Sequence, residues 1–163
     1  MSHNSPKIVI TYGTFDLFHV GHVRLLRRLS ALGDKLYVGI SSDSFNALKG
    51  KKSFYSYEER KEILESTQYV DLVFSEDTWE QKRSDIEKYK ADILGMGSDW
   101  TNKFDELNDI CEVVYLPRTE EISTTDIKKM LSKINSDELD VLESSLHSAL
   151  EVVKSVSNSF HNR

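Results

Sequence analysis

Hydrophobic and polar positions along the chain follow two periods, one typical of buried strands and one typical of amphipathic helices. The first apolar run, residues 7–13 (KIVITYG), is short, rich in β-branched residues and closed by Gly13, which is the pattern of a buried strand. Residues 21–32 then place leucine and valine at helical spacing, and Gly33 follows as a stop signal. The further predicted strands are 35–41, 69–74, 91–97 and 111–117, and the further predicted helices of this part are 56–67 and 78–89.

Strand and helix patterns therefore alternate from the first strand to about residue 117. The helix at 56–67 carries a capping signature, because Ser56 is followed three residues later by Glu59. Alternation of this kind predicts an α/β domain with a parallel sheet and helices on its faces. In such a sheet, ligands bind at the carboxyl ends of the strands.

From Ser136 onward the pattern changes to that of one amphipathic helix. Its apolar face is formed by Leu139, Leu142, Leu146, Leu150 and Val153. A stripe of this kind packs either against the chain's own domain or against a second copy of the chain. For this helix we favour packing against its own domain.

The composition narrows the class of protein. With 163 residues the chain is long enough for one domain with a core, and 29% charged and 39% hydrophobic residues are ordinary values for a soluble protein. The net charge of −6 disfavours nucleic acid as a partner, so an anion site must concentrate positive charge locally. A single cysteine, Cys111, allows no internal disulfide. Without a long apolar run or a signal-like N-terminus, we predict a cytoplasmic protein with no membrane insertion.

Two histidines, His19 and His22, lie in GTFDLFHVGH (13–22), between the first predicted strand and the first predicted helix. A zinc site would need further ligands, and no other residue completes a set, so we predict no metal site on the protein. Packing in a core explains one histidine better than two. A phosphate chain fits the pair best, because a helix N-terminus favours anions, Gly21 permits close approach and imidazole N–H groups can donate to phosphate oxygens.

The same segment, read as TYGTFDLFHVGH (11–22) together with PRTEEISTTDIK (117–128), resembles the bacterial glycerol-3-phosphate cytidylyltransferase family of the H-x-G-H nucleotidyltransferase superfamily. Further stretches agree with that family: SSDSFN (41–46), KGKK (49–52), SYEERKEILE (56–65), YVD (69–71), WEQK (79–82) and MGSDWTNKFD (96–105). The similarity covers roughly residues 7–132. We accordingly divide the chain into a catalytic domain, 1–132, and a helical extension with its tail, 133–163.

The resemblance implies a Rossmann-like fold, a homodimer, and a reaction in which CTP and an alcohol phosphate give a CDP-alcohol and pyrophosphate. The expected acceptor is sn-glycerol 3-phosphate, and the expected cofactor is Mg²⁺ bound with CTP. The product, CDP-glycerol, would feed a cell-surface polymer such as teichoic acid or capsule. The acceptor's phosphate oxygen attacks the α-phosphorus of CTP, so catalysis consists of positioning and charge neutralisation, without a protein nucleophile.

Roles for individual residues also follow from the resemblance. His19, His22, Lys49 and Arg118 are expected to be catalytic, and Lys49, Arg60 and Lys82 to bind the acceptor. The expected nucleotide contacts are His19, His22 and Arg118 with Thr14, Phe15, Val20, Gly21, Lys51, Asp99, Thr119, Ile122, Ser123, Thr124 and Thr125.

Simpler interpretations stay open for some of these residues. Arg60 can equally pair with Glu59 or Glu62 on the surface, and Ser123 can be only a helix cap. Trp79 suits the core as well as a wall of the site.

Two positions depart from the family pattern. Glu121 stands where the family usually has glycine, and Ser98 stands where an aspartate is more usual. Both leave the acceptor open, so phosphoethanolamine or another phosphorylated small molecule is an alternative, as is a nucleotide-binding module without activity. ATP-using relatives share H-x-G-H, but the linked motifs favour CTP. The chain is too short and too acidic for an aminoacyl-tRNA synthetase, which shares the histidine signature.

Overall fold

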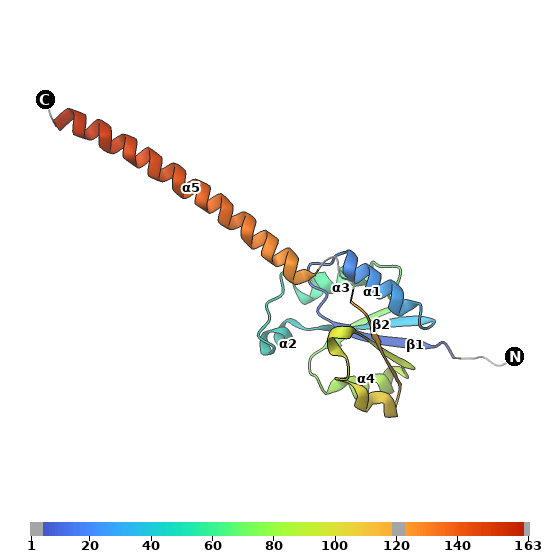
Figure 1. Ribbon diagram of the computed structural model, residues 1–163. Coiled ribbons are helices and arrows are strands. Elements are labelled where there is room, and N and C mark those ends of the chain that lie inside the picture. Colours follow the sequence, from blue (N-terminus) through green and yellow to red (C-terminus); the bar gives the residue numbers. More distant parts are fainter. Residues whose placement is uncertain (1–4, 119–122, 162–163) are drawn as a thin grey trace. The chain divides into compact units, whose positions relative to one another are not determined.

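The chain forms two compact units, Met1–Thr124 and Thr125–Arg163. The computed structural model describes residues 5–118 and 123–161, and the side chains of α5 over 124–133 and 137–151. The first unit is a sheet flanked by helices, and the second consists of the rest of one long helix, α5 (Figure 1).

A five-stranded parallel sheet is the centre of the first unit. Its strands lie in the order β3-β2-β1-β4-β5, and each neighbouring pair is parallel. This topology confirms the predicted α/β, Rossmann-like fold. The strands are β1 (Ile8–Gly13), β2 (Lys35–Ser41), β3 (Leu72–Glu76), β4 (Ile93–Gly97) and β5 (Glu112–Leu116). The helices are α1 (Val20–Ser30), α2 (Asp43–Leu48), α3 (Tyr57–Glu65), α4 (Gln81–Tyr89) and α5 (Thr124–His161), with short 3₁₀ helices η1 (Ser98–Trp100) and η2 (Asp105–Asp109).

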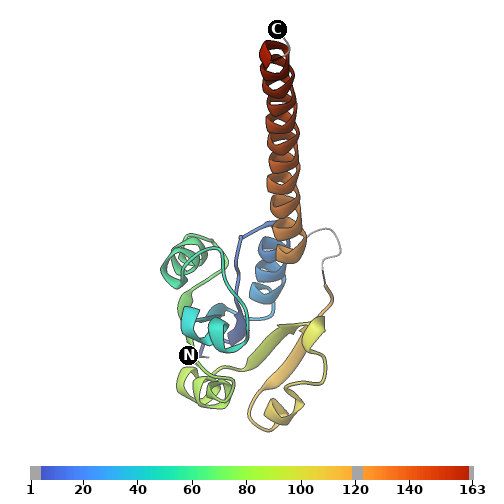
Figure 2. The same cartoon turned by 90° about the vertical axis from the view of Figure 1, so that its left-hand side faces the viewer.

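Two apolar cores lie on opposite faces of the sheet, because successive side chains of a strand point to opposite sides. Val9 of β1 packs in one core with Leu26 of α1 and Leu64 of α3. Its neighbour Ile10 packs in the other core with Ile86 of α4 and Leu107 of η2. Figure 2 shows these two layers of helices on either side of the sheet.

The strand order reverses between β1 and β4, which are neighbours in the sheet although two strands separate them in the chain. They pair at Val9 with Ile93 and at Ile10 with Leu94, ahead of their carboxyl ends at Gly13 and Gly97. A reversal point of this kind is where open parallel sheets bind their ligands. The segments that follow these two strands carry His19, His22 and Asp99, so the fold brings them to the same edge.

Two helical predictions need correction. Helix α2 was not predicted, because six residues are too few to show a helical period, although Ser42 caps the helix by accepting a hydrogen bond from the Phe45 N–H at 3.2 Å. The long helix begins at Thr124, not at Ser136. The proposed division between residues 132 and 133 falls inside this helix and stays a prediction about where the catalytic domain ends.

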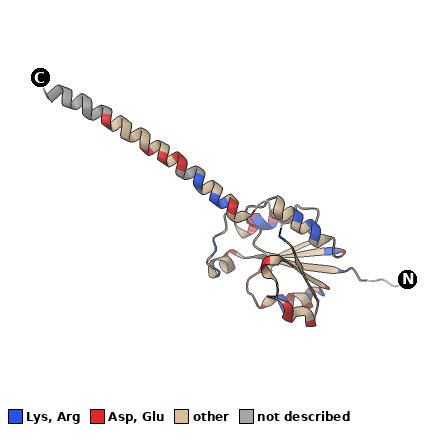
Figure 3. Ribbon diagram, viewed as in Figure 1, with Lys and Arg blue, Asp and Glu red and all other residues tan. Residues whose placement is uncertain are grey.

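Charge is unevenly distributed along the elements. Figure 3 shows basic residues on α1, whereas α5 is basic near its start and acidic further along. Across the described residues, no helix combines the length and the apolar character that crossing a membrane requires.

Candidate active site

The turn from β1 to α1 has an unusual backbone. Phe15 and Leu17 both have positive φ, at 52° and 48°, a region that non-glycine residues rarely adopt. Each such residue costs on the order of 1–3 kcal/mol, so surrounding contacts must hold the turn. The strain lies directly before the two histidines.

Asp16 supplies part of that support from inside the turn. Its side chain is buried, and its carboxylate accepts hydrogen bonds from the main-chain N–H groups of Phe54 (2.7 Å) and Tyr55 (3.0 Å). The Thr124 hydroxyl donates to the Asp16 carbonyl at 2.9 Å. Asp16 therefore ties the β1–α1 turn to two distant segments of the chain.

The two histidines form the N-terminal cap of α1. The Gly21 N–H donates to Nδ1 of His19 at 3.0 Å, and the His19 N–H donates to Nδ1 of His22 at 3.3 Å. Since each Nδ1 accepts a hydrogen bond, the proton of each neutral ring must lie on Nε2. Both rings thereby present an Nε2–H donor, and Nε2 of His19 lies 3.4 Å from the Thr124 hydroxyl.

Burial keeps both rings neutral. It lowers the pKa of His22 to about 3, with a smaller contribution from the neighbouring His19 that outweighs the opposing effect of Asp16. Burial also lowers the pKa of His19. At neutral pH the pair therefore acts through hydrogen-bond donors and not through fixed positive charge.

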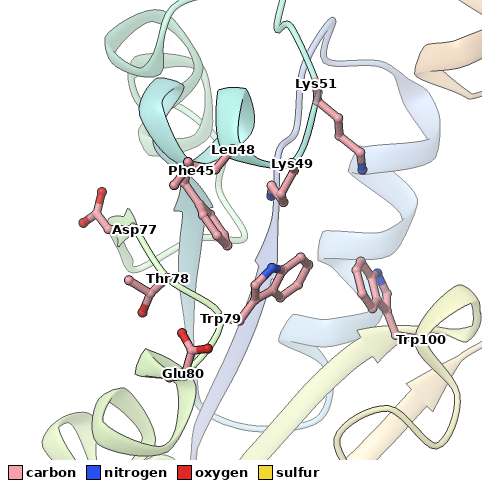
Figure 4. Close-up of a pocket in the computed structure, with 9 residues that line it drawn as sticks. All are labelled: Phe45, Leu48, Lys49, Lys51, Asp77, Thr78, Trp79, Glu80 and Trp100. Carbon is pink, nitrogen blue, oxygen red and sulfur yellow. The ribbon is translucent and has the colours of Figure 1, made fainter.

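Lysines supply the positive charge beside this turn. Lys49 and Lys51 extend from the segment after α2 toward Trp79 and Trp100 (Figure 4). Gly50, with φ of 67°, separates the two lysines and permits the left-handed turn there. The residues line a cavity of about 630 Å³ together with Phe45, Leu48, Asp77, Thr78 and Glu80.

Aromatic rings form the floor of this cavity. Trp79 lies 5.3 Å from Phe45 and 5.5 Å from Trp100, measured between ring centroids. Nζ of Lys49 lies 4.2 Å from the Phe45 centroid, so its ammonium rests against the apolar floor. The structure therefore places Trp79 in the wall of the cavity, where its side chain is partly exposed, and not in the core.

Lys82, the other predicted acceptor ligand, is placed differently. Its ammonium is buried and donates to Oε1 of Glu76. It borders a second cavity of about 350 Å³, and Trp79 lines this cavity as well as the first. Lys82 is thus adjacent to the predicted acceptor region but lies beneath Trp79.

Arg60 lies beneath the site and is fully buried. Its Nη1 donates to the carbonyls of Thr14 (2.9 Å) and Ser41 (2.8 Å), and its Nε donates to the Tyr55 carbonyl at 3.2 Å. Its Nη2 pairs with Asp43 at 2.8 Å. The interpretation of Arg60 as a surface partner of Glu59 or Glu62 is wrong. Because its donors are directed to protein atoms, we treat it as a support of the site.

The β4 and β5 ends meet at Arg118. Its guanidinium lies 3.7 Å from the Asp99 carboxylate, and both side chains are more than half exposed. The Arg118 main-chain N–H donates to the Ser98 hydroxyl at 3.2 Å, so Ser98, one of the departures from the family pattern, has a structural contact here. Arg118 and Asp99 are therefore brought together at the strand edge that carries the histidines.

The other predicted nucleotide contacts that the structure describes lie in and just after the β1–α1 turn and around the start of α5. The Thr14 hydroxyl donates to Oδ1 of Asn46 at 3.3 Å, whereas Val20 is an exposed first residue of α1. Phe15 is buried, and its ring lies 5.3 Å from that of His22. Ser123 and Thr124 are half-buried, and Thr125 belongs to the second unit. Thr119, Ile122 and the atypical Glu121 lie outside the described residues.

Sequence reasoning missed two carboxylates, Asp16 and Glu76. Asp16 lies in the histidine segment 13–22 but received no role from the sequence, and Glu76 received none because it follows the predicted strand 69–74. A usable signal was present in both cases: an acidic residue beside an apolar strand needs a buried partner. In the described part of the chain, no three His, Cys, Asp or Glu side chains are grouped so that they could hold a metal ion.

The family profile that matches this chain and two similar proteins all belong to the cytidylyltransferases. Residues 10–130 match the profile of the Cytidylyltransferase-like family. A glycerol-3-phosphate cytidylyltransferase of Staphylococcus aureus is 58% identical over 125 residues, covering 77% of this chain and 95% of the relative. One of Bacillus subtilis is 59% identical over 126 residues, covering 77% of this chain and 98% of the relative.

Solved structures support the fold alone. The lipopolysaccharide core biosynthesis protein from Thermoplasma volcanium superposes with a TM-score of 0.61 at 22% identity, covering 71% of this chain and all of that chain. The matched family region ends at residue 130, inside α5, so most of that helix lies beyond it. By sequence, fold and the geometry of its histidine turn, the chain belongs to the cytidylyltransferase-like family, among the glycerol-3-phosphate cytidylyltransferases.

Proposed function

We propose that this protein transfers CMP from CTP to sn-glycerol 3-phosphate, giving CDP-glycerol and pyrophosphate. The observation that carries this proposal is the 59% identity to a glycerol-3-phosphate cytidylyltransferase over 126 residues, almost the whole length of that relative. The site geometry is compatible with this chemistry, because neutral donors and flexible cations surround one strand edge.

The bond changes are a single substitution at phosphorus. An oxygen of the acceptor phosphate attacks the α-phosphorus of CTP, the bond from that phosphorus to the bridging oxygen breaks, and pyrophosphate leaves with the electron pair. Both sides carry the same phosphate groups, so no oxidant and no covalent protein intermediate is required. The protein's task is to align the two phosphates and to stabilise charge on the transferring group.

The histidine pair suits the triphosphate. Nε2–H groups on His19 and His22 are donors without charge, and the cap hydrogen bonds fix both rings before substrate arrives. Donors that are already oriented lose little entropy on binding. We assign Arg118 to a phosphate oxygen as well, because its guanidinium is more than half exposed beside Asp99 at the same strand edge.

The lysines suit the remaining phosphates. Lys51 is exposed at the mouth of the aromatic cavity, and we assign it to CTP. Lys49 and the deeper Lys82 are assigned to the acceptor. Beside the indole and phenyl walls of the cavity the effective dielectric constant is lower than in bulk water, which strengthens the attraction between an ammonium and a phosphate.

Mg²⁺ is proposed to arrive with CTP. The described residues offer no cluster of carboxylates for it, whereas triphosphate oxygens are ligands that Mg²⁺ prefers. When bound, the ion neutralises part of the triphosphate charge. Lys51 and Arg118 would neutralise part of the rest, and the neutral histidine N–H groups would donate hydrogen bonds to the phosphate oxygens.

We further propose that the protein works in the cytoplasm as a homodimer and that CDP-glycerol supplies a cell-surface polymer such as teichoic acid or capsule. The cytoplasm is where CTP is made. The sequence pattern alone favoured packing of this helix on the chain's own domain, but Leu139, Leu142 and Leu146 of α5 are each more than half exposed, which supports a second copy of the chain instead. Their spacing of three and four residues continues in sequence through Ala149 and Val153, the spacing of a coiled-coil seam.

One assay tests the reaction. The protein is incubated with Mg²⁺, CTP and each of several phosphorylated acceptors, and pyrophosphate release is measured. We expect turnover with glycerol 3-phosphate and little with phosphoethanolamine, and we expect CTP to be used in preference to ATP. Equal or better use of ATP, or a better acceptor, would refute the substrate assignment. No release with any pair would favour a nucleotide-binding module.

A further inference from the structure

Glu76 is a buried carboxylate that lies between the two lysines assigned to the acceptor. It is the last residue of β3, and its side chain is 3% exposed. Oε1 accepts a hydrogen bond from Nζ of Lys82. Oε2 accepts one from the Ser41 hydroxyl at 2.8 Å.

Ser41 extends this contact to the second lysine. Nζ of Lys49 donates to the Ser41 oxygen at 2.7 Å, while the Ser41 proton is directed to Glu76. The Ser41 hydroxyl therefore accepts a hydrogen bond from Lys49 and donates its own proton to Glu76. One carboxylate thus contacts Lys82 directly and Lys49 through one hydroxyl.

Aromatic rings surround the ammonium of Lys82, so water cannot take over the role of the Glu76 carboxylate as its partner. Nζ of Lys82 lies 4.5 Å from the Tyr12 ring centroid, 4.9 Å from that of Trp79 and 5.2 Å from that of Phe104. An ammonium enclosed by three rings loses hydration, which a buried anion must offset. Without the Glu76 carboxylate, Lys82 would lose its direct ionic partner.

Repulsion between Lys49 and the neighbouring cations also requires a nearby carboxylate. Burial is the largest effect that lowers the pKa of Lys49, and Lys51, Lys82 and Arg60 lower it further, whereas Glu76 raises it. Three cations thus face Lys49 from α3, from α4 and from its own segment. Glu76, which reaches Lys49 through the Ser41 hydroxyl, is the carboxylate that opposes these cations.

We propose that Glu76 is a positioning residue for acceptor binding, which holds Lys82 directly and Lys49 through Ser41. This inference rests on the proposed function for its kinetic readout only. Lys51 has no part in the Glu76–Ser41 chain of contacts described above, so the effect of Glu76 falls on the acceptor side and spares CTP.

The kinetic experiment compares Glu76→Gln with the unmodified protein. The glutamine keeps the size of the side chain and removes its charge. We expect KM for glycerol 3-phosphate to rise at least about tenfold, the factor expected when a charge-assisted hydrogen bond is lost. We expect KM for CTP to change by less than about twofold. A merely structural role would lower the active fraction, and so kcat, without separating the two KM values.

Two matched variants sharpen this result. Glu87→Gln makes the same chemical change at an exposed position of α4 and should leave both KM values unchanged. Ser41→Ala interrupts only the path to Lys49, and should give a smaller rise in acceptor KM than Glu76→Gln. In the double variant Glu76→Gln/Lys82→Ala, we expect the acceptor KM to rise by less than the product of the two single-variant factors, because Glu76 acts through Lys82. Full additivity, or equal changes in both KM values, would overturn the proposal.

A second measurement does not depend on turnover. NMR titration of the Lys49 Nζ group, assigned with Lys49→Arg, should show a lower pKa for Lys49 in Glu76→Gln than in the unmodified protein. Lys49 faces the positive charges of Lys51, Lys82 and Arg60. In Glu76→Gln it would lose the carboxylate that opposes them. Unchanged lysine titrations overturn the proposal. Lack of turnover in the unmodified protein with shifted titrations refutes the proposed substrates but supports the role of Glu76.

Discussion

The imidazole rings of His19 and His22 stack with their centroids 3.9 Å apart, and a main-chain N–H holds Nδ1 of each ring. The same two side chains therefore cap α1 and present two Nε2–H donors. The capping role and the proposed catalytic role can be separated, because they use different nitrogens of each ring. Substitutions that keep one nitrogen position and remove the other can tell the two roles apart.

Asparagine makes this separation. His19→Asn and His22→Asn keep an acceptor near the Nδ1 position, and asparagine is a good cap, but neither variant has an atom at Nε2. We expect native circular dichroism with turnover reduced about 10²–10³-fold, the usual cost of losing one transition-state donor. His19→Ala and His22→Ala should lose similar activity and some stability as well. Near-normal turnover in either asparagine variant would return that histidine to a structural role.

The buried histidine should also make stability depend on pH. The pKa of His22 falls from its ordinary value of 6.5 to about 3 in the folded chain, so the unfolded state takes up a proton first as pH falls. Its contribution is therefore fully present above pH 6.5 and is lost progressively between 6.5 and about 3. Urea denaturation at several pH values should show this decline. His22→Asn should decline less steeply over the same window, and an identical slope would contradict the assignment.

The two sides of the substrate site should divide between two lysines. Lys82→Ala should mainly raise KM for the acceptor, since Lys82 lies beneath Trp79 beside the acceptor region. Lys51→Ala should mainly impair use of CTP, since Lys51 is exposed at the mouth of the aromatic cavity. Steady-state kinetics with each substrate varied in turn would check this. Matching kinetic changes in the two variants would show that the division is wrong.

Exposed leucines on α5 should hold two copies of the chain together. Leu142→Glu combined with Leu146→Glu places charge on the apolar stripe, and we expect a shift from dimer to monomer in sedimentation equilibrium at micromolar concentration. Ser144→Glu combined with Ser148→Glu is the matched control, since residues 144 and 148 lie on the opposite side of the helix and the pair adds the same two negative charges. A dimer that survives the double substitution would place the interface elsewhere.

The sequence allowed the sheet and the histidine turn to be predicted, because both depend on local patterns. Short β-branched runs give strands, and a turn before a helix places His19 and His22 at an N-terminus whatever else surrounds it. The unpredicted features depend on partners far apart in the chain. Glu76 bonds a serine 35 residues away, and the Asp16 carboxylate bonds main chain 38 and 39 residues away. A period along one segment carries no information about such pairs.

Arg60 illustrates this limit and supplies a test of stability. Its position on α3 next to glutamates allowed a surface ion pair, but in the fold its guanidinium joins the turn after β1, the end of β2 and the segment before α3 through three carbonyls. Arg60→Met keeps most of the apolar stem and leaves these carbonyls and Asp43 without their donor.

We expect Arg60→Met to lower the free energy of unfolding by about 3 kcal/mol, because a buried carbonyl left without its donor costs on the order of 1–3 kcal/mol, whereas Asp43 is more than half exposed. Arg27→Met, on the exposed side of α1, is the control and should stay within about 0.5 kcal/mol of the unmodified protein. Urea denaturation measures both. Because the Thr14 carbonyl is one of the acceptors, loosening should spread to the strained turn at Phe15 and reduce turnover before unfolding. A variant of normal stability that lost only acceptor affinity would instead make Arg60 a substrate ligand.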